Sequence, residues 1–165
     1  MKINTSNDEI TIYLNRYYTS KCDFLSLDSL EEYMNDLLAK IKKIYNIKLN
    51  GFYNIDVYID TNYGVIVNLK KEDIEYYDYF SDQIDTQVSI HNNSTFLFKI
   101  DDYFEIKDYL KNCNYSLYKY NNELYIKLNN KIDDIKLGNL LEYSKEICYD
   151  MDKIIKLHNL LFCNK

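Results

Sequence analysis

The sequence predicts an α+β protein made of two antiparallel strand-helix-strand-strand units, with two further helices packed on the second unit. Three observations lead to this prediction. Segments whose apolar residues recur with the period of a strand alternate with segments of helical period. The same order of elements occurs twice along the chain. Apolar residues make up 47% of the 165 residues, which is enough for a chain of this length to bury a core.

The first half is predicted to contain a strand, a helix and a hairpin. Apolar and polar side chains alternate over residues 10–15, the pattern of a half-buried strand. From Asp28 to Tyr45, apolar residues recur at the i, i+3, i+4 and i+7 positions, which predicts an amphipathic helix. Alternation returns at residues 53–59 and 65–69, on either side of the turn-forming residues 60–64, and this pattern predicts a hairpin.

The second half repeats this order. We expect a strand at 96–100, a helix from Asp102 to about Leu110, and a second hairpin over residues 115–128. Two more helices are predicted at 135–147 and 152–162. The last of them is apolar nearly all round, so we expect it to be buried.

An acidic, aromatic segment separates the halves, so we expect units at 1–75 and 88–165 joined by a connector at 76–87. Residues 72–85 carry six acids and no base. Aromatic rings beside carboxylates are typical of a protein-binding surface. The predicted protein-binding residues are Glu72, Asp73, Glu75, Tyr76, Tyr77, Asp78, Tyr79, Phe80, Asp82 and Asp85. The alternative is a plain linker whose rings tuck under the two halves while its acids stay solvated.

No catalytic, cofactor or metal site is predicted. His91 stands at a strand end and His158 in the apolar last helix, where a core or boundary position is expected. Asp56 and Asp60 fall on one face of a strand, where either a cation site or a solvent-facing polar row would explain them. The pair Glu105 and Lys107 falls on a predicted helix and indicates surface charge. Three glycines in the whole chain leave no phosphate-binding loop.

The overall charge and the cysteines indicate a soluble, cytoplasmic protein whose partner is another protein. A net charge of −6 argues against direct nucleic-acid binding. No apolar run is long enough to span a membrane, and the first residues do not resemble a signal peptide. The four cysteines lie too far apart in sequence for a zinc knuckle or a redox pair, and isolated thiols fit a reducing compartment.

The second half resembles the C-terminal domain of MecA, the bacterial adaptor that delivers proteins to the ClpC unfoldase. Residues 96–104 are similar to that domain's opening strand and helix start, and residues 116–128 to its Tyr-rich hairpin. Residues 140–144, Leu-Leu-Glu-Tyr-Ser, are close to the family's Leu-Leu-Glu-Tyr-Gly, with Ser144 in place of the glycine. The first half follows the element order of the MecA N-terminal domain. The resemblance implies an adaptor that binds both a client and a AAA+ unfoldase.

Three classes of function follow from these patterns. The first is a non-enzymatic, adaptor-like protein-binding protein, possessing no cofactor. The second is an acidic inhibitor, of phage or mobile-element type, that imitates nucleic acid and occupies a basic groove of a nucleic-acid-processing enzyme. The third is a small enzyme whose site assembles only in three dimensions, and no residue pattern favours it.

Overall fold

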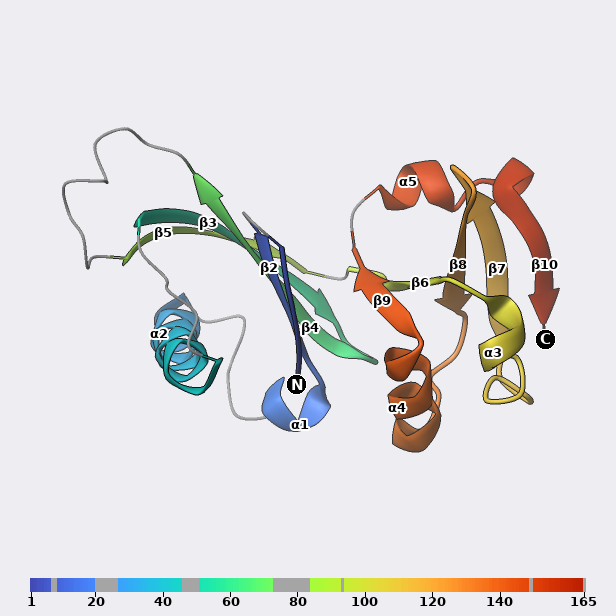
Figure 1. The fold of residues 1–165 in the computed structure, drawn as a ribbon, viewed down its shortest axis with the longest axis horizontal. Coiled ribbons are helices and arrows are strands. Elements are labelled where there is room, and N and C mark those ends of the chain that lie inside the picture. The colour runs from blue at the N-terminus through green and yellow to red at the C-terminus, as the bar shows by residue number, and fades with distance from the viewer. Residues whose placement is uncertain are drawn as a thin grey trace. The chain divides into compact units, whose positions relative to one another are not determined.

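The computed structural model describes residues 1–6, 9–19, 27–45, 51–72, 84–92, 94–148 and 150–164. Within these residues the predicted α+β class is confirmed, because helices accompany two five-stranded sheets (Figure 1). The chain divides into two compact units, Met1–Asn92 and Asn93–Lys165, and each is considered by itself. None of the helices in the described ranges has the length and apolar character that crossing a lipid bilayer requires.

The first unit is built on one sheet. Its elements are β1 (Lys2–Thr5), β2 (Glu9–Leu14), α1 (Arg16–Thr19), α2 (Leu27–Tyr45), β3 (Gly51–Asp60), β4 (Gly64–Glu72) and β5 (Ile84–His91). The strand order is β1-β2-β4-β3-β5, and Figure 1 shows α2 lying across one face of this sheet. The predicted first strand, long helix and first hairpin are confirmed as β2, α2 and the β3–β4 pair.

The core of the first unit lies between α2 and the sheet. Alternate side chains of β2, β3 and β4 meet the apolar stripe of α2, as the two periodicities predict. The buried members are Ile10, Ile12, Leu14, Leu30, Met34, Leu37, Leu38, Ile41, Tyr53, Ile55, Val57, Val65, Val67 and Leu69. Ile3, Val88 and Ile90 are only partly buried against this cluster, so the outer strands β1 and β5 add little to it.

Strand β5 corrects the prediction of a purely antiparallel unit, because it pairs parallel with β3. A parallel partner is reached without a tight turn, so no local turn signal marks such a strand in the sequence. The pairing also places β5 in the first sheet. The first unit therefore extends to Asn92, beyond the predicted connector at 76–87 and the predicted start of the second unit at residue 88.

The second unit is built on an antiparallel sheet. Its elements are β6 (Leu97–Ile100), α3 (Tyr103–Ile106), β7 (Tyr115–Tyr120), β8 (Glu123–Leu128), α4 (Asp134–Glu142), β9 (Ser144–Ile147), α5 (Met151–Ile154), the 3₁₀ helix η2 (Leu157–Asn159) and β10 (Leu160–Asn164). The strand order is β10-β7-β8-β6-β9.

Both faces of this sheet are buried. Ile154 of α5 belongs to a buried cluster on one face with Tyr118 and Tyr125. Phe98 and Ile126, which point to the opposite face, are also buried, so both faces are covered.

The second predicted hairpin is confirmed as β7 and β8. Its turn residues Asn121 and Asn122 have φ angles of 49° and 65°, the left-handed values of a two-residue hairpin turn that asparagine tolerates. The predicted helix start at Asp102 is also confirmed, since its carboxylate accepts a hydrogen bond from the Phe104 backbone N–H at 2.7 Å. That helix ends at Ile106, and turns replace the remainder that was predicted to reach Leu110.

The predicted helix at 135–147 is wrong in its second half. Helix α4 ends at Glu142, where the Ser144 hydroxyl donates a hydrogen bond to the Leu140 carbonyl at 2.6 Å. Residues 144–147 then form β9 and pair antiparallel with β6. Apolar residues that continue a helical stripe also fit one face of a short strand, so periodicity alone does not separate the two.

The predicted buried helix at 152–162 is also wrong. Helix α5 is a single turn, and the Asn159 side-chain amide donates to the Lys153 and Ile154 carbonyls at its end. The Ile154 carbonyl also accepts the Lys156 backbone N–H. The chain continues through η2 into β10, which pairs with β7. His158, predicted to lie in or at the edge of a core, is exposed in η2. The apolar residues of this stretch are therefore divided between α5, the 3₁₀ helix η2 and the edge strand β10.

The two units share the connectivity of their central strands, as the predicted reuse of one strand-helix-strand-strand unit requires. In each, the strand before the helix pairs antiparallel with the second strand of the hairpin, β2 with β4 and β6 with β8. The full orders also correspond, β1-β2-β4-β3-β5 against β9-β6-β8-β7-β10. The units differ at one edge, where β5 is parallel to β3 and β10 is antiparallel to β7.

Candidate functional site

The predicted protein-binding segment is described only at its two ends. Glu72 ends β4, and its carboxylate accepts a hydrogen bond of 2.8 Å from the Asn54 side-chain amide on β3. Asp85 lies in β5, opposite Phe52 in the parallel register. The remaining predicted residues, Asp73, Glu75, Tyr76, Tyr77, Asp78, Tyr79, Phe80 and Asp82, lie outside the described residues. The segment therefore stays a prediction.

Aromatic side chains gather in the second unit around α3 and β10. The Tyr103 ring lies edge-on to Phe104 and Phe162, with ring centroids 6.0 and 5.4 Å apart. Phe162 also meets Tyr115, whose hydroxyl is hydrogen-bonded to that of Tyr103 at 2.7 Å. Phe104 is 71% exposed, and the ammonium of Lys107 lies 4.9 Å from the centroid of its ring. A large apolar ring is thus held in place while remaining open to a partner.

A second aromatic pair lies between the turn after α3 and the end of α4. The rings of Tyr109 and Tyr143 are stacked with centroids 5.7 Å apart. A hydrogen bond with Tyr109, together with weaker effects that include the nearby Glu142 and Glu105 carboxylates, raises the pKa of Tyr143 above 10. Tyr109 follows the end of α3 at Ile106 by three residues, so the pair continues from the element that carries Tyr103 and Phe104. We call Tyr103, Phe104, Tyr109, Tyr143 and Phe162 the aromatic surface.

Sequence reasoning misses this surface. Tyr103 and Phe104 follow a recognised helix cap, but nothing in a four-residue helix shows which ring is left exposed. Phe162 is assigned to a buried helix, whereas it is more than one-third exposed on β10. The usable signal is the helical period: adjacent positions such as Tyr103 and Phe104 point in different directions, so a helix that packs one of the two rings leaves the other toward solvent.

The Tyr103–Tyr115 hydrogen bond makes the second unit sensitive to alkaline pH. Burial, and then the hydrogen bond to Tyr103, raise the pKa of Tyr115 above its ordinary value of 10. A raised pKa in the folded state means that the stabilisation is complete below pH 10 and is lost as the pH rises beyond it. We expect the free energy of unfolding to fall above pH 10, and Tyr115→Phe to reduce that slope. Urea unfolding of the wild type and of Tyr115→Phe at pH 9 to 11 measures how the free energy of unfolding falls with pH. An equal fall in the two proteins would mean that Tyr115 is not the titrating group.

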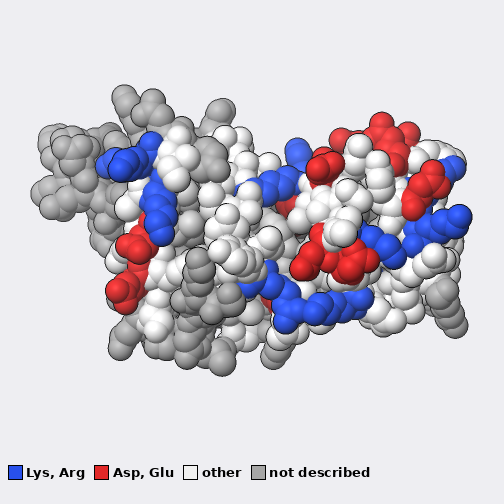
Figure 2. Space-filling model, turned by 90° about the horizontal axis from the view of Figure 1, so that it is seen from below, with Lys and Arg blue, Asp and Glu red and all other residues white. Residues whose placement is uncertain are grey.

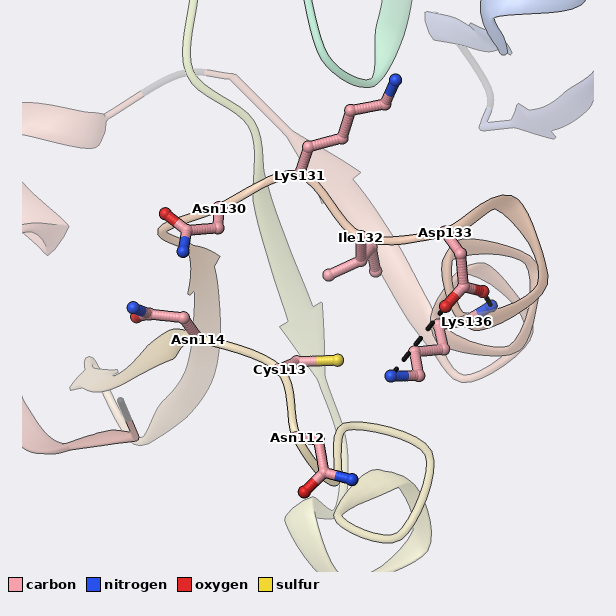
Figure 3. Close-up of a pocket in the computed structure, with 8 residues that line it drawn as sticks. All are labelled: Asn112, Cys113, Asn114, Asn130, Lys131, Ile132, Asp133 and Lys136. Carbon is pink, nitrogen blue, oxygen red and sulfur yellow. Dashed lines mark hydrogen bonds and ion pairs between the residues drawn. The ribbon is translucent and has the colours of Figure 1, made fainter.

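A polar pocket of about 400 Å³ opens in the same unit (Figure 3). The residues that line it are Asn112, Cys113, Asn114, Asn130, Lys131, Ile132, Asp133 and Lys136. The Asp133 carboxylate caps α4 by accepting from the Lys136 backbone N–H at 2.8 Å, and it lies 3.9 Å from the Lys136 ammonium. Figure 3 shows the Lys131 side chain directed away from Cys113. The Asp133 carboxylate is thus engaged in the helix cap, and the other polar side chains of the pocket are asparagines, lysines and a thiol.

Asp56 and Asp60 have different roles in the first unit, so the structure does not bring them together as a cation site. Asp56 Oδ1 lies 2.9 Å from Nε2 of His91, and the His91 ring stacks on Tyr58. Asp60 is buried, and its carboxylate accepts the backbone N–H groups of Asn62 and Tyr63 in the β3–β4 turn. Within the described ranges, no three metal-ligating side chains come together.

The described residues also carry charged side chains of both signs and free thiols. Figure 2 shows basic and acidic side chains lying beside one another on the face drawn. Cys113 and Cys148 are buried thiols, and Cys163 is an exposed one. Cys22 lies outside the described residues.

Comparisons with protein-family models, with curated proteins and with solved structures found no match for this chain. The resemblance to MecA therefore stays a prediction from residues 96–104, 116–128 and 140–144.

Proposed function

We propose that this chain is a non-enzymatic, adaptor-like protein-binding protein that docks its partner on the aromatic surface. The observation that carries the proposal is the 71% exposure of Phe104 on a structured element. Large rings left in water are unfavourable in a monomer, and aromatic side chains are enriched where proteins bind one another. A partner that covers Phe104 with an apolar side chain removes this cost.

The geometry around Phe104 favours tight binding because little order has to be created. Asp102 fixes the start of α3, and Tyr103 is anchored through its hydroxyl to buried Tyr115. Lys107 covers part of the Phe104 ring. A ring already held in its bound position loses little conformational entropy on association.

The resemblance to MecA supports the adaptor reading of this surface. Residues 96–104, which resemble the opening of the MecA C-terminal domain, contribute Tyr103 and Phe104. The Leu-Leu-Glu-Tyr-Ser stretch at 140–144 contributes Tyr143. The proposed partner is accordingly a AAA+ unfoldase of the ClpC type, to which the chain would recruit a client.

Binding of a purified ClpC-type unfoldase tests the proposal. Phe104→Ala should weaken binding at least about tenfold, as expected for a central aromatic residue, with little change in thermal stability. The matched control is Leu157→Ala, since Leu157 is an apolar side chain of the same unit that is 87% exposed. We expect this control to leave binding unchanged. Equal affinity of the Phe104 variant and the wild type would remove the aromatic surface from the interface.

The same assay separates the aromatic surface from the acidic segment. Asp78→Lys combined with Asp82→Lys should leave unfoldase binding intact if docking occurs on the second unit alone. Loss of binding in this variant, with Phe104→Ala silent, would instead favour the predicted acidic segment. Salt-sensitive binding of a nucleic-acid-processing enzyme, with no binding of the unfoldase, would favour the inhibitor alternative.

A further inference from the structure

Strand β5 is the longest edge strand among the described residues, and its middle, residues 86–90, has none of the sequence features that usually protect an edge. Asp85 is the residue just before this neutral stretch. Strand β5 has eight residues, whereas the other three edge strands, β1, β9 and β10, have four, four and five. Natural edges are commonly protected by shortness, charge, proline or a bulge. Strand β10 has such an irregularity, between Leu160 and Phe162. In β5, residues 86–90 read Thr-Gln-Val-Ser-Ile, with no charge and no proline.

The side chains of β5 suit a second strand laid along it. Gln87 and Ser89 are exposed on the face turned away from α2. Val88 and Ile90 point to the other face and are only partly buried against the first core cluster. A strand placed alongside would satisfy the outer backbone groups and extend that apolar layer beyond Val88.

We propose that β5 is the site of self-association, and that its occupant is β5 of a second copy of this chain. Identical strands related by a two-fold axis perpendicular to the sheet run antiparallel, so the two five-stranded sheets join into one of ten strands. With the axis at Val88, the two Val88 side chains meet, Thr86 lies opposite Ile90, and Gln87 lies opposite Ser89. Opposed residues share a face, so Val88 meets Val88 and Thr86 meets Ile90 on the helix side, and the neutral polar Gln87 and Ser89 meet on the other. No like charges oppose each other between residues 86 and 90, which makes this strand complementary to itself.

Sedimentation of the full chain over a range of concentrations tests the proposal. The wild type should pass from monomer to dimer as concentration rises. Gln87→Lys combined with Ser89→Lys places lysines opposite lysines across the axis and should weaken association at least about tenfold. The control is Asn4→Lys on β1, the other edge of the same sheet, and it should leave association unchanged. A wild type that stays monomeric, or a lysine variant that still dimerises, would overturn the proposal.

A charge-reversal experiment separates loss of pairing from loss of folding. A chain carrying Gln87→Glu and Ser89→Glu should also be monomeric, but mixed with the lysine chain it should form a heterodimer through opposite charges. Failure of the mixed dimer to form would overturn the antiparallel register. If the lysines instead abolish binding of a different protein by a monomeric wild type, the edge accepts another chain and the proposal is wrong. Phe104→Ala should not affect self-association, so this test is independent of the proposed unfoldase docking.

Discussion

Gly64→Ala should destabilise the first unit by about 3–5 kcal/mol, or prevent it from folding. Gly64 has φ +115°, a conformation that residues with a Cβ rarely adopt, and a Cβ there would lie 2.1 Å from the Leu14 carbonyl oxygen. That oxygen belongs to the backbone of β2, which pairs with β4 at Leu14 and Val65. It cannot rotate away as a side chain could, so relief requires the two central strands to separate. Urea unfolding measures the loss as a lower midpoint.

The other two glycines provide graded controls. At Gly51, with φ +97°, the nearest atom to an added Cβ is the flexible Lys71 Cε at 3.3 Å, so Gly51→Ala should cost only about 1 kcal/mol. Gly138 lies inside α4 with no atom within 4 Å of an added Cβ. Gly138→Ala should stabilise the second unit by about 0.5–1 kcal/mol through helix propensity. Similar losses from all three changes would contradict the role assigned to Gly64.

Leu37→Ala should cost the first unit about 2–5 kcal/mol, since the lost burial is followed by a cavity that the neighbours fill only in part. Leu37 is 6% exposed and lies in the cluster formed by α2 and the sheet. Lys43→Ala removes an exposed side chain from the same helix and should change stability by less than about 0.5 kcal/mol. The ratio of the two effects, read from denaturant midpoints at equal slope, tests the orientation of α2. Comparable losses would mean that its buried face is misassigned.

Periodicity succeeds where an element is long and amphipathic. The helix α2, with 19 residues, and the two hairpins keep their pattern over enough positions for burial to dictate a single conformation. Periodicity fails for β9 and β10, which have only four and five residues. These segments are strands because β9 pairs with β6 and β10 pairs with β7. A hydrogen-bonding partner remote in sequence leaves no local trace. Strand β5 is missed for the same reason, because each of its residues pairs in parallel with a residue of β3 that lies 33 positions earlier in the sequence, as Ile84 does with Gly51.

The aromatic surface could not be derived from sequence for a related reason. With 19 tyrosines and 7 phenylalanines in the chain, composition gives no ground for choosing Phe104. Within the single turn of α3, Ile106 is buried and Phe104 is exposed. The Asp102 cap was predictable because a side-chain acceptor followed by an acid three residues later has a local cause. Which ring meets solvent depends on what packs beneath the helix.

The first core cluster draws its buried members from α2, β2, β3 and β4, while β1 and β5 supply only partly buried side chains. We expect α2, β2, β3 and β4 to unfold as one cooperative unit, with β1 and β5 at its periphery. Backbone amides of β3 and β4 should therefore exchange hydrogen chiefly when this whole cooperative unit unfolds. Release of β1 breaks one ladder of four residue pairs and leaves the cluster intact. Local opening of β1 is therefore expected to require less free energy than global unfolding of the first unit.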